Sequence, residues 1–355
     1  MSVTRLTRTG NNFDFLRFMA ASVVVIGHCF WLGGNIHREP LLNWTGYTDM
    51  ADIAVNIFFI MSGFLITHSW LKKSNVLEFA LKRALRIFPA LIVSVLLTVL
   101  VVGSLATDRS LNEYFYNRQT LHYVSNILLM THFHLPGVFA NNPFPDTVNG
   151  SVWTLPYEVF MYACVLALGL LGALRKSTVA LIWAALYLVH LVLLPEWNIS
   201  SLIVQKLARL GMFFFAGALL YLLRDLIPWR GPIALFLLAL VAATATHEIS
   251  YYVLALTLPY LVIYLAYVRL PLVSSFGRYG DFSYGLYIFS FPIQQLIVLW
   301  LGEALTFKAF VVISYLTSLG LAIFSWHIIE SPALGLKRAL GRLRTSPVSV
   351  TSRAP

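Results

Sequence analysis

The stretch NNFDFLRFMAASVVVIGHCFWLGG, residues 11–34, decides the fold class. It is long and apolar enough to cross a bilayer as a helix, yet it carries Arg17 and His28. The two residues are eleven positions apart, so at about 100° per residue they return to within about 20° of one helix face. Along the helix axis they are separated by about 16 Å. Because an ionisable side chain in lipid costs about 2.5–3.5 kcal/mol, a helix that keeps two on one face indicates a functional use.

Composition supports a membrane protein. Hydrophobic residues make up 59% of the 355 residues and charged residues 11%, whereas soluble domains carry about 25% charged residues. The apolar segments do not alternate in polarity as strands of a membrane barrel do. We therefore predict an all-α polytopic membrane protein with about ten transmembrane helices. The candidate segments are 13–33, 52–71, 84–104, 152–174, 178–195, 206–223, 232–247, 250–268, 283–302 and 308–328.

The distribution of basic residues predicts the topology. With ten spans and both termini inside, eighteen Lys and Arg fall in inner segments and six in outer segments. This bias follows the positive-inside rule, so we expect a multi-pass protein of the cell inner (plasma) membrane with both termini cytoplasmic. The same topology explains the net charge of +10, and we expect no nucleic-acid partner. The outer basic residues are Arg38, Arg109, Arg118, Lys206, Arg209 and Lys308.

No Ser- or Pro-rich linker interrupts the chain before its end. We expect one integral-membrane domain over residues 1–340, followed by a disordered basic cytoplasmic tail over 341–355. The longest connection, residues 105–151, lies on the outer side, and its length and aromatic content are typical of a lid or a binding surface. Its histidines are expected at the membrane interface rather than on a metal ion, and we predict no metal site.

Four polar side chains are predicted to share an outer layer of the membrane. His28 lies about 22 Å from the cytoplasmic side of its helix. Asp52 and Asn56 open the second span, and Glu158 is the last residue of SVWTLPYE, the start of the fourth. In the second span, FFIMSGFLI places a glycine at residue 63, where another backbone or a ligand can approach closely.

A second group is predicted near the cytoplasmic side. Arg83 and Arg86 share a helix face just before the third span. Tyr284 lies at the start of the ninth span, and Glu330 lies just after the end of the tenth. Basic side chains against an otherwise lipid-like inner face are suited to a multiply phosphorylated anion.

Six motifs occur in an order that resembles the integral-membrane acyltransferase 3 family. They are FLRFMAASVVVIGH, DIAVNIFFIMSGFLIT, KRALRIFPA, NGSVWTLPYE, GDFSYGLYIFSFP and HIIESP. The resemblance covers nearly the whole chain and implies about ten spans, a cytoplasmic acyl-CoA donor and an acceptor hydroxyl on the far side. It also implies that the essential Arg–His pair of the first span falls on Arg17 and His28. One position departs from the pattern, since many members have His where this sequence has Ser290.

From the resemblance and the residue chemistry we predict a membrane O-acyltransferase, an O-acetyltransferase in the first instance, that modifies a cell-envelope polysaccharide. The acceptor is expected to be a saccharide or lipid-linked saccharide, and no cofactor is expected beyond the acyl-CoA substrate, acetyl-CoA in the first instance. A histidine is the usual base for a hydroxyl nucleophile. His28, Arg17 and Glu158 are therefore the predicted catalytic residues, Glu158 as the carboxylate that orients His28.

The predicted residues for substrate and donor binding are Arg83, Arg86, Asp52, Asn56, Trp153, Tyr284 and Glu330. The alternative function is a transporter or exporter of a lipid-linked sugar or small metabolite. It would favour broken helices in corresponding positions of two halves, and the sequence shows no such pairing.

Overall fold

The computed structural model describes residues 11–197, 201–268, 270, 273–302 and 304–336. Within these ranges the regular structure is helical, and no strand is present. The same ranges contain nine helical segments long and apolar enough to cross a membrane. The predicted seventh span corresponds to α12 (Gly231–Thr244), a shorter apolar helix of 14 residues. The all-α polytopic class is thus confirmed, whereas the predicted tail 341–355 lies outside the described residues.

The nine spanning segments are Phe13–Leu32, Met50–Lys72, Val76–Ala106, Gly150–Leu170, Lys176–Glu196, Leu202–Leu223, Ser250–Tyr267, Ser283–Leu301 and Phe307–Leu336. The α-helices that build them, and those that connect them, are α1 (Phe13–Leu32), α2 (Pro40–Thr45), α3 (Met50–Lys72), α4 (Val76–Leu97), α5 (Ser104–Ala106), α6 (Leu111–Phe115), α7 (Arg118–Val124), α8 (Leu155–Leu170), α9 (Lys176–Leu188), α10 (Leu194–Glu196), α11 (Leu202–Leu223), α12 (Gly231–Thr244), α13 (Ser250–Tyr267), α14 (Ser283–Leu301) and α15 (Phe307–Ser325). Short 3₁₀ turns are η1 (Ile36–Arg38), η3 (Ser125–Leu128), η4 (Gly150–Thr154) and η6 (Phe276–Arg278), and π turns are η2 (Thr98–Gly103), η5 (Val189–Leu193) and η7 (Trp326–Glu330).

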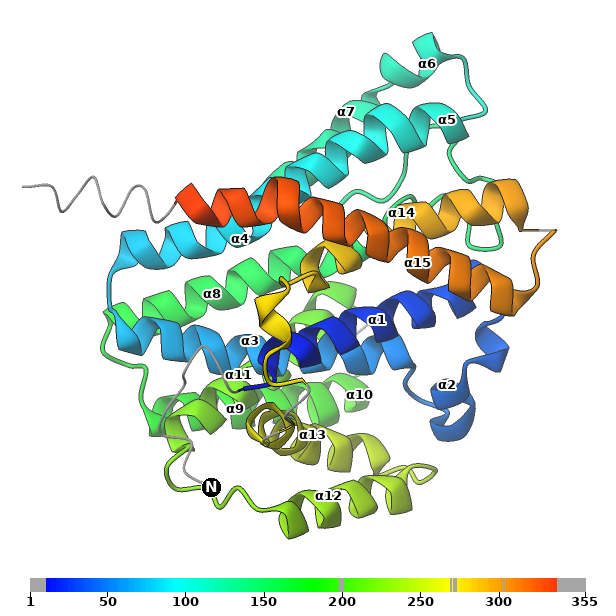
Figure 1. Ribbon diagram of the computed structural model, residues 1–355. Coiled ribbons are helices and arrows are strands. Elements are labelled where there is room, and N and C mark those ends of the chain that lie inside the picture. Colours follow the sequence, from blue (N-terminus) through cyan, green and yellow to red (C-terminus); the bar gives the residue numbers. More distant parts are fainter. Residues whose placement is uncertain (1–10, 198–200, 269, 271–272, 303, 337–355) are drawn as a thin grey trace, which may run out of the picture.

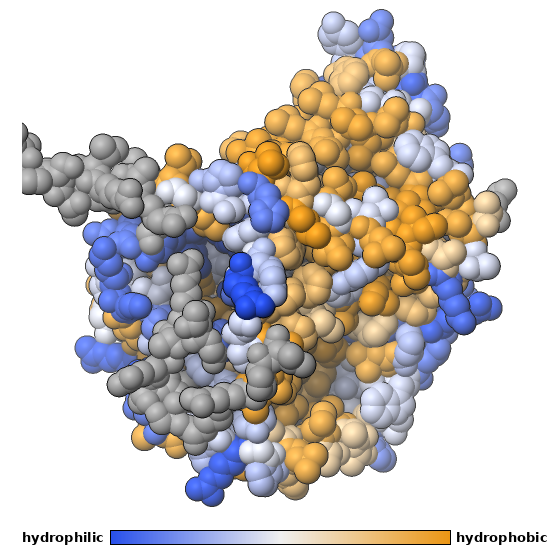
Figure 2. All heavy atoms as spheres, viewed as in Figure 1, coloured by the Kyte–Doolittle hydropathy of each residue, from blue (hydrophilic) through white to orange (hydrophobic). Residues whose placement is uncertain are grey.

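The long helices form a bundle in which α1, α3, α8 and α15 run across the view of Figure 1. The spanning segment that contains α4 extends to α5 and carries the short helices α6 and α7 beyond the rest of the bundle (Figure 1). Apolar side chains cover much of the visible face, as Figure 2 shows, whereas hydrophilic ones gather towards its edges. This pattern is expected when the helix flanks face lipid and the helix ends face water.

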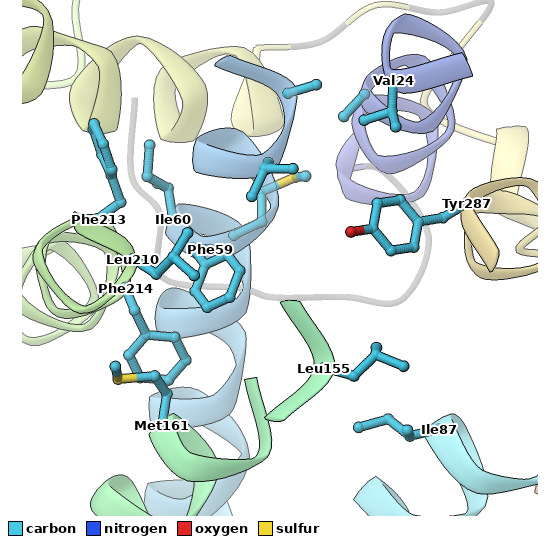
Figure 3. Packing of buried hydrophobic residues seen from close by; sticks show 14 of the residues in the cluster. Val24, Phe59, Ile60, Ile87, Leu155, Met161, Leu210, Phe213, Phe214 and Tyr287 are labelled. Atoms are coloured by element: carbon cyan, nitrogen blue, oxygen red, sulfur yellow. The ribbon is translucent and has the colours of Figure 1, made fainter. Parts of the chain in front are cut away.

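Glycines bring α3 and α11 into backbone contact. A Cβ atom at Gly63 would lie 1.8 Å from the carbonyl oxygen of Phe214, and one at Gly217 would lie 2.0 Å from that of Ile60. The close approach predicted at Gly63 is therefore confirmed, and the neighbour is a helix backbone. Figure 3 shows side chains of α3 and α11, Ile60 and Phe214 among them, packing together beside this contact. Small residues that allow such contact are a general means of packing helices in membranes.

The connection 105–151, which is predicted to lie on the outer side, is fastened to α14 by buried amides. Asn142 donates to the backbone and side-chain oxygens of Gln295, at 3.0 and 2.7 Å. The Gln295 amide in turn donates to the carbonyl oxygen of Phe144 at 2.8 Å, and Asn149 donates to that of Ile288 at 2.9 Å. Since these side chains are buried, their hydrogen bonds offset the cost of removing polar groups from water. The connection is thus held on the bundle along much of its later half.

A neighbouring amide joins α14 to α1. The side chain of Gln294 is fully buried and donates to the carbonyl oxygen of Val25 at 2.8 Å. It also approaches the thiol of Cys29, with 3.0 Å between nitrogen and sulfur. Both partners flank His28 on the α1 helix. Consequently, α14 supports the turn of α1 that carries this histidine.

Candidate functional site

An ion cluster joins four helical regions near the N-terminal ends of α1, α4 and α14, the ends that are predicted to lie on the inner side. The inner ion cluster consists of Arg17, Arg86, Asp281 and Glu330. Arg86 contacts Asp281 with 2.8 Å between Nη2 and Oδ2, and Glu330 with 3.3 Å between Nη1 and Oε2. Arg17 Nη1 lies 3.6 Å from the same Asp281 oxygen and 3.4 Å from Asp14. The structure therefore brings Arg17 and the predicted residues Arg86 and Glu330 together through Asp281.

Two further features position Arg86. Its guanidinium lies over the ring of Tyr284, 5.6 Å from the ring centroid, and the Tyr284 hydroxyl donates to the carbonyl oxygen of Ile87 at 2.9 Å. Glu330 is carried by the π turn η7 and also accepts a hydrogen bond from Ser325 at 3.0 Å. Its side chain is 2% exposed. A carboxylate this deeply buried is stabilised only when cations and donors such as these surround it.

Asp281 lies just before α14 and is shared by two arginines. Burial by itself would raise the pKa of its carboxyl group, but the guanidinium groups of Arg86 and Arg17 hold that pKa below its usual range. Ser283 adds a hydrogen bond of 2.5 Å from its hydroxyl to Asp281 Oδ1. Asp281 is therefore an ionised bridge between α1 and α4.

Arg83 and Glu158 lie near the inner ion cluster, which differs from the predicted position of Glu158 beside His28. The Glu158 carboxylate accepts a short hydrogen bond from Tyr162, and Arg83 lies 5.9 Å from the centroid of the Tyr162 ring. Arg83 interacts electrostatically with both Glu158 and Arg17. Its buried Nε atom has no hydrogen-bond partner among the described residues, which also hold no carboxylate within ion-pair distance of its side chain.

The reason for this difference lies in the start of the fourth span. Gly150 of η4 is the residue that packs on Phe291, where a Cβ would come within 2.6 Å of the ring. Phe291 in turn contacts His28, so Gly150 and His28 lie at about the same level along the helices. Glu158 follows two turns further along the chain and lies deeper. Within the described residues no carboxylate lies within ion-pair distance of His28, and the predicted Glu158–His28 contact is absent.

His28 occupies a largely apolar environment. Its ring meets that of Phe291 edge-on, with 5.2 Å between the centroids. The Nδ1 atom is buried and has no hydrogen-bond partner in the described part of the chain. The residue as a whole is only partly buried. An imidazole with an unpaired nitrogen and some exposure can exchange a proton with a bound hydroxyl.

A second polar group lies near the N-terminal ends of α3 and α11, which are predicted to face the outer side. We call Asp52, Trp153, Lys206 and Arg209 the outer cluster. Arg209 forms an ion pair with Asp52, with 2.9 Å between Nη1 and Oδ1. The Lys206 ammonium lies 4.4 Å from the centroid of a Trp153 ring, and the Arg209 guanidinium 5.8 Å from it. The predicted binding residues Asp52 and Trp153 thus lie in one place.

Asn56 and Ser290 do not join either cluster. Asn56 is fully buried, and among the described residues neither its amide nitrogen nor its oxygen has a hydrogen-bond partner. Ser290 is also fully buried, and its hydroxyl donates to the carbonyl oxygen of Tyr287 in its own helix at 3.5 Å. The expected separation of Asp52 and Asn56 by one turn is present, but the ion pair of Asp52 does not include Asn56.

Four contributors are absent from the predicted set: Asp281, Tyr162, Lys206 and Arg209. Asp281 opens the motif GDFSYG, and a carboxylate beside an apolar helix start is a signal that the sequence contains. Lys206 and Arg209 are three residues apart within an apolar helix, the same i,i+3 spacing that singled out Arg83 and Arg86. Their place among the outer basic residues predicted only a role in topology.

Comparisons with known proteins place this geometry in context. Residues 11–327 match a family model described as an acyltransferase domain. Over 333 residues the chain is 30% identical to a protein named O-acetyl transferase from Shigella phage Sf6. This alignment covers 90% of this chain and 95% of the relative. Over 363 residues it is 28% identical to Nodulation protein 10 of Rhizobium leguminosarum bv. viciae, covering 95% and 96%. No solved structure matches the chain.

Proposed function

The chain belongs to the acyltransferase 3 family of multi-pass membrane O-acyltransferases, and from this membership we propose that it moves an acetyl group from cytoplasmic acyl-CoA to a hydroxyl of an extracytoplasmic saccharide. One observation carries the proposal. Helix α1 holds Arg17 against the inner ion cluster, and eleven residues later it holds His28 beside α3 and α14. A single helix therefore connects a charged inner site with a histidine near the outer side.

His28 is the proposed general base. As the acceptor oxygen attacks the thioester carbonyl carbon, its hydroxyl proton passes to His28. The carbon–sulfur bond breaks as the acyl group is transferred, and the proton then passes to the departing CoA sulfur. Because no carboxylate in the described residues orients the imidazole, the Phe291 ring and the buried surroundings hold its position. Glu158 then acts on the donor side instead of in a triad with His28.

The donor phosphates are assigned chiefly to Arg83. Arg86 is already paired with Asp281 and Glu330, so its charge is balanced within the protein. Arg83 is half-buried and lies over Tyr162 without a carboxylate in ion-pair range in the described ranges. A guanidinium in this state is well suited to a phosphate oxygen. Arg17, in loose contact with two carboxylates, would turn towards the phosphate end of the donor, which leaves the thioester to extend along α1 towards His28.

The proposed location is the cell inner membrane with cytoplasmic termini. It is supported by the basic residues at the same ends of the helices as the inner ion cluster, such as Lys72 and Lys73 at the end of α3. These positions lie on the side that the positive-inside rule assigns to the cytoplasm. Acyl-CoA, a cytoplasmic metabolite, would then reach Arg83 from that side.

The test compares His28→Ala with His247→Ala, an exposed histidine between α12 and α13. Both variants are purified and placed in proteoliposomes, where turnover of labelled acetyl-CoA is measured. In a second assay, the surface saccharide of cells that express each variant is analysed for acetyl groups by mass spectrometry. We expect His28→Ala to insert normally and to lose acetyl transfer, while His247→Ala keeps it. Full transfer by His28→Ala would remove His28 as the base. Solute uptake without any acetyl-CoA turnover in the unaltered protein would favour transport.

A further inference from the structure

Two cations of the outer cluster lie over one aromatic face. Lys206 and Arg209 are three residues apart in the first turns of α11, and both approach Trp153 of η4, at 4.4 and 5.8 Å from the ring centroid. A lysine near the end of a membrane helix would otherwise extend its ammonium towards the headgroups. Here the ammonium instead lies over an indole within the protein.

The charges of the outer cluster do not cancel. Asp52 balances Arg209 at 2.9 Å. Lys206 lies in electrostatic range of Asp52 but outside ion-pair distance of every carboxylate in the described residues. The two cations and one carboxylate therefore leave one positive charge on a half-buried group. Because such a charge is costly within a membrane helix, its retention indicates a partner that carries a negative charge.

The outer cluster lies at the depth of His28. Gly27 packs against Ala51, where a Cβ on the glycine would lie 3.1 Å from that of the alanine, so Asp52 follows directly after a residue that touches the α1 turn of His28. On the other side, Trp153 belongs to the same short turn as Gly150, which packs on Phe291 beneath His28. A molecule held at Trp153 therefore lies at the same level along the helices as the imidazole.

The chemistry of the outer cluster points to one class of acceptor. An indole face offers an apolar surface for the C–H groups of a sugar ring. An ammonium above that face can pair with a carboxylate or a phosphate on the same sugar. The Arg209–Asp52 pair, with the Asp52 side chain 38% exposed, offers both a donor and an acceptor for hydroxyl groups.

From this geometry we infer that the outer cluster binds an anionic saccharide, with Lys206 on its carboxylate or phosphate and Trp153 beneath its ring. The inference rests on the proposed transfer to a saccharide and defines the class of acceptor. It assigns substrate recognition to Lys206 and Arg209 in addition to their topological role.

Binding is tested without catalysis, in nanodiscs of phosphatidylcholine that contain the full chain. Titration calorimetry measures the affinity for trigalacturonate, for galactose 1-phosphate and for neutral galactotriose. We expect at least one anionic sugar to bind at least tenfold more tightly than galactotriose. Lys206→Met should remove most of this difference, and Lys206→Arg should restore it. Lys308→Met, an exposed lysine at the outer end of α15, is the matched control and should change nothing.

Three results would overturn the inference. The first is equal affinity for charged and neutral sugars, and the second is unaltered anion preference in Lys206→Met. The third is a preference that vanishes when phosphatidylglycerol is added, because the site would then belong to a lipid headgroup. If trigalacturonate alone is preferred, the anion is a carboxylate, and if galactose 1-phosphate alone is preferred, it is a phosphate.

The binding assay also separates this inference from the proposed function. His28→Ala should retain the charge preference in binding while it loses transfer. If the unaltered protein binds the anionic sugar but never acetylates a saccharide, the proposed function fails and the binding site stands. If transfer occurs with the same KM for charged and neutral acceptors, the inference fails and the proposed function stands.

Discussion

We predict that Arg86 stabilises the fold, whereas Arg17 acts in acetyl transfer, and substitutions of the two residues test this difference. Arg86→Met would leave Glu330, 2% exposed, without a cation, and would leave Asp281 with only the 3.6 Å contact to Arg17. Removing one partner of a buried ion pair costs about 3–5 kcal/mol. Because 23% of the Arg86 side chain is exposed, we expect the lower end, about 3 kcal/mol. This corresponds to about a 100-fold change in the unfolding equilibrium constant.

Arg17→Met is the comparison. The Arg17 contacts are longer, at 3.4 and 3.6 Å, and its side chain is 26% exposed. Such a pair contributes about 0–1 kcal/mol to stability. We therefore expect Arg17→Met to fold as the unaltered protein does while acetyl transfer is lost. Both free energies of unfolding can be measured by SDS titration in mixed micelles, with tryptophan fluorescence as the signal.

A second variant tests whether the lost stability comes from the ion cluster. Combining Arg86→Met with Glu330→Gln removes the unpaired carboxylate, so it should recover about 1–2 kcal/mol of the loss. Unchanged stability in Arg86→Met would refute the view of Arg86 as a residue held by its carboxylates. A stability loss in Arg17→Met as large as that in Arg86→Met would refute the distinction between the two arginines.

Further expectations concern glycine contacts and acid stability. Gly63→Ala places its Cβ atom 1.8 Å from the carbonyl oxygen of Phe214, so it should prevent recovery of monodisperse protein in size-exclusion chromatography, whereas Gly320→Ala in α15, where a Cβ meets nothing within 4 Å, should be tolerated. Gly150→Ala should displace Phe291 and lower kcat for acetyl transfer about 10–100-fold, and the added methyl group in the packed core should also lower the melting temperature. The pKa of Asp281 is held below its ordinary 3.8, so its carboxylate stabilises the folded chain above pH 3.8, and this stability is lost as the pH falls through the lowered pKa. When the free energy of unfolding is measured against pH, Asp281→Asn should lack this loss of stability in acid. The same pH dependence in Asp281→Asn and in the unaltered protein would contradict this expectation.

Hydropathy and spacing predict much of the fold and part of the candidate site. Apolar runs locate the spanning helices because lipid requires every backbone group to be paired within its own segment. The face shared by Arg17 and His28 follows from helix periodicity alone. The contact of Arg86 with Asp281 links distant parts of the chain and depends on how α4 packs beside α14, which a local pattern does not contain.

The depth of Glu158 in the bundle is a second feature that the sequence pattern did not predict. Depth counted from a predicted helix start placed it with His28, but the packing of Gly150 on Phe291 sets the actual level. A shift of two turns at one helix was enough to move a carboxylate from one side of the site to the other. Lys206 is a different case. The sequence contains its i,i+3 spacing to Arg209, but the contact of Lys206 with Trp153 depends on tertiary packing.

The two parallel helices α1 and α14 each touch both ends of the site. Helix α14 follows Asp281, places Tyr284 beneath Arg86 and ends its contact with the site at Phe291, against His28. The amide of Gln294 ties it to α1. A small sliding of α14 against α1 would displace Asp281 in the inner ion cluster and Phe291 beside His28 at the same time. If the proposed acyl-CoA donor displaces Asp281 when it binds, α14 carries that displacement to the contact of Phe291 with His28.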